Sequence, residues 1–499
     1  MIGSPQPRAT LRLPAEPATA TVWRRADLVA GERPIDVAER FRDLPGLALL
    51  ESARPGRTGR WSYLTADPLG VVGDASPGPD PFLGARTLLA RMSHGADVEG
   101  TSRPPFAAGL VGYLGYDLAR YLEQVPSRAV ADQDLPVLRL ALHDWVVAWD
   151  RRTGEAFLGG RAVDGDVGRL ERRLSSVTER LRARPASEAG WWRTPAGGAD
   201  SDRPLRFRSG LDRSAYERRV ERVRDAIAAG DLYQANLARR LEADFDADPW
   251  PLYRRLRTGD PALFAAFLDL GDRPGTPPRD GFADGTIAPR RAILSASPEP
   301  FLAVRAGGHV ASDPIKGTRP RGRTSEEDRA LARELLASDK DRAENVMIVD
   351  DLRNDLGRVA RPGTVRVPRL CRLERTAAVQ HLVSTVTARL VPGRDPFDLL
   401  AAAFPGGSIT GAPKIRAMEL IDELEPVRRG PYTGAIGWIG PDGTMATSIA
   451  IRTFVADGER LTLHAGGGIT WRSDASTEWA ETVAKARGPL SAVGAVEAS

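Results

Sequence analysis

Apolar and polar residues follow two repeating patterns along the chain, one typical of strands and one typical of helices. From residue 134 to 162 apolar residues alternate or run together, stop at the polar residues 151–154 and then resume, which predicts a β-hairpin. In the next segment an apolar residue recurs every three or four positions, the spacing of one helix face; these residues are Val167, Leu170, Leu174, Val177 and Leu181. The pattern therefore predicts a hairpin and then a helix that closes a first lobe.

A second amphipathic helix is predicted where the next lobe begins. Ser214 precedes Glu217 by three residues, which is the spacing of a capping box at a helix N-terminus. The apolar face of this helix stops before Gly230 and consists of Tyr216, Val220, Val223 and Ile227. We expect this helix to open the second lobe.

Polar stretches without periodicity divide the chain. Residues 1–20 are rich in Pro, Ala and Thr and predict a flexible N-terminal arm. A Pro-, Gly- and Ser-rich stretch at 184–204 predicts a linker between an N-terminal lobe, 21–183, and a second lobe, 205–499. A polar insertion at 271–290 predicts a long loop within the second lobe. Because strand-like and helix-like segments alternate without a regular βαβ rhythm, the predicted class is α+β.

Composition narrows the classes of function. The 499 residues are 42% hydrophobic and 27% charged, as in an ordinary globular protein. The 70 Lys and Arg residues exceed the 66 Asp and Glu residues by only four, and they alternate with acids, so we expect no nucleic-acid partner. No apolar run reaches the roughly 18 to 20 residues of a membrane span, so we expect no membrane contact and a cytoplasmic location. The single Cys371 excludes an intramolecular disulfide and, with five scattered histidines, argues against a zinc site.

Three segments combine glycines with acidic and basic residues in apolar surroundings. The first is DPIKGTRPRGR, 313–323, in which Lys316 lies between an isoleucine and a glycine. Such a lysine is either an exposed charge in a turn or a desolvated amine whose lowered pKa makes it a nucleophile. The residues alone leave both interpretations open.

The second and third segments have the composition of binding sites. In AENVMIVDDLRNDLGRV, 343–359, Glu344 begins a helix-like stretch rich in carboxylates, which suits Mg²⁺ but equally a solvated helix face. In FPGGSITGAPKIRAMELIDELEP, 404–426, glycines lead into Pro413, a favoured first position of a helix. Free backbone N–H groups at that helix start would suit a carboxylate or a phosphate. The spacing does not match a Walker loop.

These segments carry a resemblance to the chorismate-binding enzymes, the family that includes anthranilate synthase component I, aminodeoxychorismate synthase component I and isochorismate synthase. The matching motifs occur in order from about 208 to 490 and are SPEPF, PIKGT, AEN, LRNDLGRV, GSITGAPKIRAME, YTGAIG, ATSIAIRT, AGGGI and STEWAETVAKA. The resemblance implies a fold of two facing β-sheets with helices packed outside, as in anthranilate synthase component I. It places the active site between the sheets.

The resemblance also assigns roles to individual residues. It implies that Glu344 and Glu481 hold Mg²⁺, which grips the ring carboxylate of chorismate. The residues implied to bind substrate are Ser408, Gly411, Lys414, Tyr432, Arg452, Gly467, Gly468 and His381. For His381 a role as an ordinary core histidine stays open. Glu478 and Lys485 flank the second metal glutamate at helical spacing, either as ligands or as supporting residues.

Two positions separate the reactions of this family. Isochorismate and salicylate synthases are similar to one another in having a lysine base where this chain has Gln234, and glutamine cannot act as a general base. Anthranilate synthases usually read PIAGT where this chain reads PIKGT, and Lys316 marks the aminodeoxychorismate branch. The resemblance implies that Lys316 attacks C2 of chorismate and that Glu299 protonates the departing C4 hydroxyl. Ammonia then enters at C4. Amination that yields anthranilate or 2-amino-2-deoxyisochorismate is the alternative.

Two further expectations concern ligands and partners. The segment 49–68 resembles the family segment that forms a tryptophan-binding pocket, with Glu51, Ser52 and Tyr63 as candidate contacts; the alternative is an ordinary strand and loop. A non-catalytic, ligand-sensing relative is the second class of function, but the intact catalytic and metal-binding set argues against it. Because Cys371 lacks a glycine-rich nucleophile turn, we expect ammonia to come from a separate glutamine amidotransferase subunit.

Overall fold

The structure is a computed structural model that describes residues 21–54, 59–92, 103–183, 204–272, 291–376 and 379–498. The predicted arm at 1–20 lies outside the described residues. Most of the predicted linker at 184–204 and of the polar insertion at 271–290 also lies outside them.

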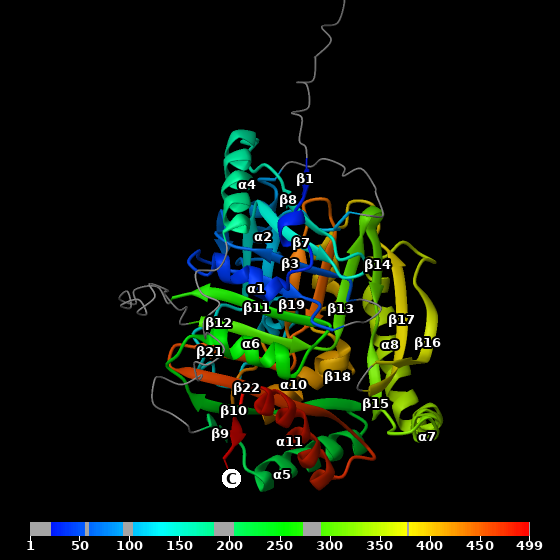
Figure 1. Cartoon of the computed structure of the whole chain (residues 1–499). Helices are drawn as coiled ribbons and strands as arrows, with labels where there is room; N and C mark the ends of the chain where they lie inside the picture. The colour runs from blue at the N-terminus through cyan, green and yellow to red at the C-terminus, as the bar shows by residue number, and fades with distance from the viewer. Residues whose placement is uncertain are drawn as a thin grey trace, which may run out of the picture.

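Two large β-sheets form the body of the molecule (Figure 1). In the described part of the chain the larger sheet has 13 strands, in the order β1 (Val22–Arg25), β8 (Ala156–Gly160), β7 (Trp145–Asp150), β3 (Trp61–Thr65), β2 (Ala48–Glu51), β11 (Phe264–Gly271), β12 (Arg291–Ser297), β21 (Thr453–Asp457), β22 (Arg460–Thr470), β10 (Gln234–Asp244), β9 (Arg206–Ser209) and β23 (Val496–Glu497), with β18 (Gly411–Ala412) paired to β10. The smaller sheet has 10 strands there, in the order β15 (Ile315–Pro320), β17 (Val379–Arg389), β14 (His309–Ser312), β13 (Pro300–Arg305), β20 (Met445–Ile449), β19 (Ala435–Ile439), β5 (Gly109–Leu114), β6 (Leu138–His143) and β4 (Gly70–Val72), with β16 (Arg366–Arg375) paired to β17. The α+β class and the two sheets are confirmed.

The two predicted lobes share both sheets. Leu50 of β2 lies opposite Ala266 of β11 in the larger sheet, and Val111 of β5 lies opposite Trp438 of β19 in the smaller sheet. The boundary drawn near residue 184 therefore divides the sequence but does not divide the molecule into separate bodies.

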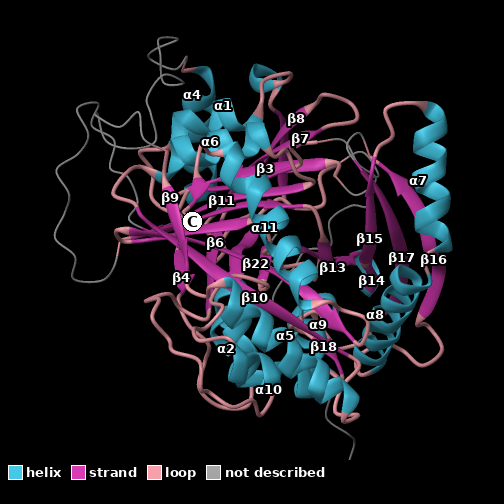
Figure 2. Cartoon of the chain, turned by 90° about the horizontal axis from the view of Figure 1, so that it is seen from below, coloured by secondary structure: helices cyan, strands magenta, loops and turns pink. Residues whose placement is uncertain are grey.

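Helices cover the outer faces of the sheets (Figure 2). They are α1 (Pro34–Ala38), α2 (Leu83–Leu89), α3 (Ala119–Leu122), α4 (Val167–Arg182), α5 (Arg213–Ala228), α6 (Pro249–Gly259), α7 (Ser325–Ala337), α8 (Asp339–Gly357), α9 (Pro396–Ala403), α10 (Lys414–Leu424) and α11 (Ala475–Ala492). Helices α1, α4 and α6 pack on the outer face of the larger sheet, whereas α8 and α9 pack on the smaller sheet. This arrangement leaves the inner faces of the sheets to meet one another.

Alternation of side chains along each strand builds the layer between the sheets. In β11 the buried Leu268 packs inward with Ile436 and Trp438 of the smaller sheet, while the neighbouring Phe267 packs outward against the helices. Successive side chains of a strand point to opposite faces, so a strand of a two-sheet protein covered by helices is apolar on both sides. The continuous apolar runs of this chain follow from that requirement.

The structure confirms most of the local predictions and corrects one. Helix α4 and the β7–β8 hairpin form where the apolar pattern predicted them, although β6 joins the other sheet. The capping residue of α5 is Asp212 and not Ser214: the Asp212 side chain accepts the N–H of Ala215, and the Ser214 hydroxyl donates to the same carboxylate. A carboxylate beside the exposed N–H groups of a helix start is favourable, which explains the difference.

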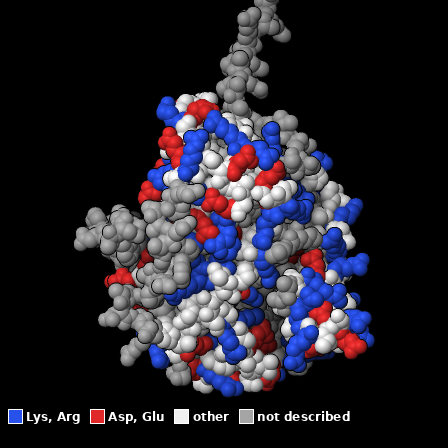
Figure 3. Space-filling view, in the orientation of Figure 1, with Lys and Arg blue, Asp and Glu red and all other residues white. Residues whose placement is uncertain are grey.

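The surface mixes charges of both signs. Figure 3 shows basic and acidic side chains interspersed on the viewed face. Among the described residues, the helices are too short or too polar to cross a membrane. The cytoplasmic location and the absence of a nucleic-acid partner remain predictions.

Candidate active site

The candidate site lies where the chain passes twice between the two sheets. Residues 298 and 299 connect β12 of the larger sheet to β13 of the smaller one, and residues 450–452 connect β20 back to β21. Backbone hydrogen bonds hold the two crossings together: Ile449 donates to the carbonyl of Glu299 at 3.1 Å, and Ala296 donates to the carbonyl of Arg452 at 3.1 Å. Glu299 is thus fixed at a corner that both sheets support.

Lys316, Ser408 and Glu299 form a connected group. The Lys316 ammonium donates to the carbonyl of Ser408 at 3.2 Å, and the Ser408 hydroxyl donates to Oε1 of Glu299 at 3.0 Å. Lys316 lies in β15, Ser408 in a 3₁₀ turn at Gly407–Ile409, and Glu299 at the corner. The structure therefore brings together three predicted site residues that lie up to 109 positions apart in sequence.

The surroundings disfavour the charged forms of these groups. Burial lowers the pKa of Lys316, and the nearby carboxylates of Glu344 and Glu299 only partly oppose this shift. Burial likewise raises the pKa of Glu299, against the influence of Lys316 and Ser408. Desolvation penalises whichever protonation state carries the charge, so both groups move toward neutrality. A neutral amine and a protonated carboxylic acid are the forms needed by a nucleophile and by a general acid.

A second group of carboxylates approaches the same space from α8 and α11. Burial raises the pKa of Glu344, whose carboxylate also feels the charges of Lys316 and Glu481. Burial acts in the same direction on Glu481, but the Lys485 ammonium, 2.6 Å from its Oε1, outweighs burial and the pKa is lowered. Lys485 also donates to the carbonyl of Gly466 at 2.9 Å. Helix α11 is thus held against the glycine-rich strand β22.

The glycines of β22 make room for these carboxylates. A Cβ atom at Gly467 would lie 3.3 Å from Oε2 of Glu478 and 3.3 Å from Oε1 of Glu481. Glu478 is buried; its Oε1 accepts from Ser473 at 2.5 Å, and its Oε2 has no hydrogen-bond partner within the described chain. Oxygen donors of this kind fit Mg²⁺, which keeps several waters in its coordination shell. Among the described residues, however, three or more Asp, Glu, His or Cys side chains nowhere converge as a metal site.

Gln234 lies in β10, the strand that pairs with β22. Its side chain is fully buried, and neither amide atom has a hydrogen-bond partner within the described residues. A Cβ atom at Gly468 would come within 2.5 Å of the Gln234 Nε2 and 3.0 Å of the Asn236 Oδ1. The absence of a side chain at Gly468 therefore leaves room for the carboxamides of Gln234 and Asn236.

Tyr432, Arg452 and His381 lie in distinct settings. The Tyr432 ring stacks on the imidazole of His464, with ring centroids 4.7 Å apart. Arg452 is exposed, adopts a left-handed backbone conformation with φ of 51°, and lies 3.4 Å from Asp260. Burial and the nearby positive charge of Arg452 lower the pKa of His381 to about 4, which keeps the imidazole neutral near pH 7.

Gly411 and Lys414 support the loop that carries Ser408. Gly411 has φ of 149°, and a Cβ atom there would lie 2.1 Å from the carbonyl oxygen of Gln234, so only glycine fits. The Lys414 ammonium pairs with Asp355 of α8 and donates to the carbonyl of Ala403 at 3.3 Å. The structure thus gives Lys414 protein partners, and its role in binding substrate remains a prediction.

The candidate tryptophan contacts line a separate space between the sheets. Glu51, Ser52 and Tyr63 border a cavity of about 1580 Å³ whose lining comes from both sheets. Glu51 is buried and forms a two-point ion pair with Arg257, at 2.5 and 3.0 Å. The Ser52 hydroxyl donates to the carbonyl of Trp61 at 3.0 Å. The carboxylate and the hydroxyl therefore already have partners within the chain.

Two residues in contact with the site were not found from the sequence. Asn236 donates to the carbonyl of Ser408 at 2.8 Å. Arg429 is buried beside Tyr432 and contacts the carbonyl of Ile409. The available signals were that Asn236 lies two residues after Gln234 and that Arg429 lies three residues before the motif YTGAIG.

Comparisons with known proteins agree with this geometry. The family model described as chorismate binding enzyme matches residues 74–491, so the chain belongs to this family. The chain is 39% identical to anthranilate synthase component 1 of Streptomyces coelicolor, over 97% of this chain and 94% of that protein. It is 41% identical to aminodeoxychorismate synthase component 1 of Klebsiella aerogenes, over 76% of each.

Solved structures agree on the fold. Anthranilate synthase component I from Streptococcus pneumoniae superposes with a TM-score of 0.73 at 30% identity, covering 87% of this chain and 93% of that one. The menaquinone-specific isochorismate synthase of Escherichia coli superposes with a TM-score of 0.68 at 16% identity, covering 97% and 96%. The chain is therefore a chorismate-binding enzyme with the fold of anthranilate synthase component I.

Proposed function

We propose that this chain is the chorismate-aminating component of an aminodeoxychorismate synthase, which replaces the C4 hydroxyl of chorismate by an amino group. The observation that carries the proposal is the half-buried Lys316 amine, joined through Ser408 to the carboxyl of Glu299. This arrangement supplies a nucleophile and a proton donor at one place. The product, 4-amino-4-deoxychorismate, leads to 4-aminobenzoate for folate or for a specialised metabolite.

The proposed reaction has two displacements. In the first, the neutral amine of Lys316 forms a bond to C2, the ring double bonds shift, and the C4 hydroxyl departs as water with a proton from Glu299. In the second, ammonia forms a bond to C4, the double bonds shift back, and the bond from C2 to Lys316 breaks. The carboxylate of Glu299 takes the proton that ammonia loses, so the sum is chorismate plus ammonia to aminodeoxychorismate plus water. The pKa shifts of Lys316 and Glu299 support these starting states.

In the same proposal Glu344 and Glu481 hold Mg²⁺. Bound there, the ion would offset the negative charge of the substrate carboxylates and orient the ring. The oxygen donors, and the glycine at 467 that leaves room beside the Glu478 and Glu481 carboxylates, support this assignment. The chain's own residues would orient the rest of the substrate. Tyr432 and Arg452 would bind the enolpyruvyl carboxylate, and the backbone of Gly467 and Gly468 would close against the substrate.

The nitrogen source in this proposal is a glutamine amidotransferase subunit. Cys371 is buried, and its sulfur lies 3.6 Å from Oδ1 of Asn345, so it is not placed to serve as an exposed glutaminase nucleophile. Bound tryptophan in the cavity beside Glu51, Ser52 and Tyr63 is a further expectation. Since Glu51 already pairs with Arg257, an amino acid there would have to share that carboxylate.

A second candidate function is amination at C2, to give anthranilate or 2-amino-2-deoxyisochorismate. It is favoured by one observation: relatives aligned over 97% of this chain are named anthranilate synthase component 1. Lys316 argues for the first candidate, because C2 amination by ammonia needs no lysine at that place.

Product analysis separates the two candidates. The purified chain is incubated with chorismate, Mg²⁺ and an ammonium salt, and the products are identified by chromatography and mass spectrometry. We expect 4-amino-4-deoxychorismate. Anthranilate as the main product would refute the proposed function and establish the second candidate.

A further inference from the structure

The Arg429 guanidinium uses all of its hydrogen-bonding capacity inside the protein. The side chain is 2% exposed. Its Nε and Nη2 donate to the two oxygens of Glu425 at 2.8 and 2.6 Å, and Nη2 also donates to the carbonyl of Asn236 at 3.0 Å. Its Nη1 donates to the carbonyl of Ile409 at 3.0 Å and to the hydroxyl of Thr433 at 3.3 Å. These five contacts match the five N–H donors of an arginine.

The three contacts to Ile409, Asn236 and Thr433 reach three different segments around the candidate site. Ile409 follows Ser408, whose carbonyl and hydroxyl contact Lys316 and Glu299. Asn236 lies in β10, opposite Gly468 of β22. Thr433 follows Tyr432, and the guanidinium carbon lies 5.7 Å from the centre of the Tyr432 ring. One buried side chain therefore ties together the loop, the strand and the tyrosine that surround the substrate space.

The other side of this guanidinium is fixed by residues of the N-terminal part of the chain. The Arg429 guanidinium lies 4.7 Å from the centre of the Tyr116 ring. The next residue, Gly430, donates its N–H to Asp117 at 3.0 Å and accepts the N–H of Tyr116 at 2.7 Å. Glu425, besides holding Arg429, accepts the N–H of Ala238 in β10 at 2.9 Å.

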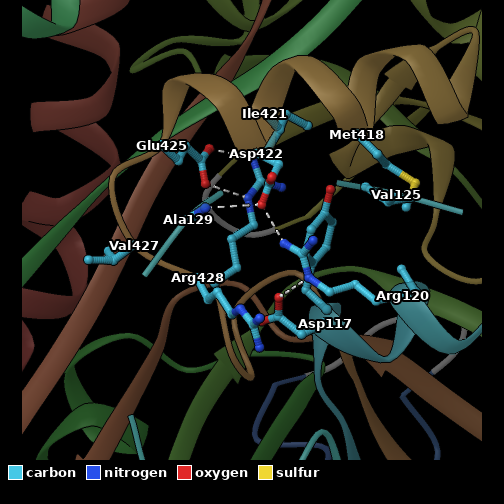
Figure 4. A pocket seen from close by; sticks show the side chains of 13 residues that line it. Asp117, Arg120, Val125, Ala129, Met418, Ile421, Asp422, Glu425, Val427 and Arg428 are labelled. Carbon is cyan, nitrogen blue, oxygen red and sulfur yellow. Dashed lines mark hydrogen bonds and ion pairs between the residues drawn. The ribbon is translucent and has the colours of Figure 1, made fainter. Parts of the chain in front are cut away.

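A second set of ion pairs reinforces this contact. Figure 4 shows Asp422, near the end of α10, facing Arg120, with Asp117 close by; these residues line a small pocket. Arg120 donates to Asp117 at 3.1 Å and to Asp422 at 2.5 Å. The volume of this pocket is about 10 Å³, roughly the least that accommodates one water. The packing leaves little room for the Arg429 side chain to move.

We propose that the Arg429–Glu425 ion pair is a positioning element, which sets Tyr432 and the Ser408 loop at the spacing that chorismate requires. The inference rests on the proposed substrate role of Tyr432. Since the guanidinium has no unused donor, a shift of any one wall breaks a buried hydrogen bond. Arginine is required because its planar fork meets five acceptors and lies over aromatic rings, whereas the lysine ammonium is a flexible point charge with three donors.

The test uses Arg429→Lys and Glu425→Gln in the full chain, with the ammonia-dependent reaction as the assay. We expect KM for chorismate to rise at least tenfold in both variants, while kcat falls less than KM rises. Circular dichroism and urea unfolding establish that each variant is folded. Should Arg429→Lys not fold, Glu425→Gln, which keeps the side-chain shape, decides the outcome by the same criterion.

Arg254→Lys is the matched control. Arg254 is also buried and pairs with two carboxylates, Asp36 at 2.7 Å and Glu39 at 2.6 Å, but these lie in the N-terminal part of the chain. We expect Arg254→Lys to lower stability without changing KM. An equal rise of KM in Arg254→Lys, or an unchanged KM in folded Arg429→Lys, would overturn the proposal.

A double-mutant cycle tests whether Arg429 acts through Tyr432. If it does, Tyr432→Phe raises KM on its own, and adding Arg429→Lys raises it less than in the wild-type background. Fully independent effects, or an unchanged KM in Tyr432→Phe, would overturn the inference. The identity of the product tests the proposed function separately, because KM for chorismate can be measured for either aminated product.

Discussion

Two groups of charged residues near the candidate site differ in the partners that they have within the protein. In the first, the active-site group, Lys316 has a carbonyl oxygen as its partner and no carboxylate within ion-pair distance among the described residues, and Glu299 has a hydroxyl. In the second, Arg429 has the two oxygens of Glu425, and Arg120 has Asp117 and Asp422.

The pKa shifts express the same contrast. Burial lowers the pKa of Lys316 and raises that of Glu299, so the protein favours their neutral forms. For Arg429 burial acts against the charge, but Glu425 outweighs it and the pKa is raised. Ionisable groups with perturbed pKa values and no charged partner are candidates for catalysis, whereas fully paired buried charges hold their surroundings in place. The contrast is consistent with the proposed roles: Lys316 and Glu299 in the reaction, and the Arg429–Glu425 pair in the frame around it.

The largest effect is expected when the active-site group loses its amine. Lys316→Ala should lower aminodeoxychorismate formation by at least about a thousandfold, because an interaction that belongs to the reaction path is lost. The change recreates the PIAGT sequence, so direct attack of ammonia at C2 remains open and some C2-aminated product can form. Mass spectrometry of the products formed with ammonia measures both outcomes.

Lys316→Arg is the matched variant for this experiment. Arginine keeps the positive charge but is a poor nucleophile. If Lys316 forms a covalent bond, Lys316→Arg is as inactive as Lys316→Ala. Near-normal product formation by Lys316→Arg would eliminate the covalent mechanism and leave Lys316 as an electrostatic contact.

For the free energy of unfolding, in contrast to activity, a change at Arg429 should have a larger effect than a change at Lys316. Arg429→Met leaves the buried carboxylate of Glu425 without its ion pair and should lower the free energy of unfolding by ~3–5 kcal/mol. Lys316→Met removes a half-buried amine that lacks such a partner and should leave that free energy unchanged or raise it. Urea unfolding of both variants near pH 7 makes the comparison. A larger loss of unfolding free energy in Lys316→Met than in Arg429→Met would contradict this assignment of Arg429 to the frame.

A smaller effect is expected for the carboxylates of the proposed metal site. Glu344→Gln and Glu481→Gln each remove one negative charge and keep the side-chain shape, so Mg²⁺ affinity should fall by at least tenfold while the fold is retained. Glu334→Gln, on the surface helix α7, is the control and should leave Mg²⁺ binding unchanged. Isothermal titration of each variant with MgCl₂ measures the affinity. Wild-type binding by Glu344→Gln would remove Glu344 from the proposed site.

The sequence pattern predicted local elements well and their arrangement in space less well. The periodic spacing from Val167 to Leu181 identified α4, because one face of a helix is a local property of the chain. The pairing of Leu50 with Ala266 was not predictable from the pattern, since the two residues lie more than 200 positions apart and both are simply apolar. For the same reason the pattern could not predict that the two parts of the chain share both sheets. The two-sheet fold came from the family motifs alone.

The candidate site shows the same limit. Motif resemblance identified Lys316, Glu299 and Ser408, and the structure brings them together. It could not identify Arg429, because Arg429 acts through hydrogen bonds to backbone carbonyls of distant segments. Every residue has a backbone carbonyl, so the sequence holds no signal for such contacts. Nor could it predict that the Lys414 ammonium pairs with helix α8, since this pairing depends on how the loop packs.

The smallest expected effect concerns His381, a neutral histidine on the strand that pairs with the strand of Lys316. Burial, with the positive charges of Arg54 and Arg452, lowers the pKa of His381 to about 4 from its ordinary 6.5. In the unfolded chain this imidazole takes up a proton near pH 6.5, whereas in the folded chain it stays neutral until about pH 4. The unfolded state therefore binds more protons across this window. The contribution to stability is complete above pH 6.5 and is lost as the pH falls toward 4.

One such histidine contributes a slope of at most ~1.4 kcal/mol per pH unit to the free energy of unfolding in that window. Burial also lowers the pKa of His143, to about 3, and of His464, so the wild-type slope contains up to three such contributions. His381→Gln keeps a polar partner for the Thr318 hydroxyl, now 2.9 Å from the ring, and should make the slope shallower by up to one contribution. Urea unfolding at several pH values between about 5 and 6.5 measures it. An unchanged slope would mean that His381 takes up its proton as readily in the folded chain as in the unfolded one. His381 would then belong with the solvated surface groups and not with the uncompensated groups around Lys316.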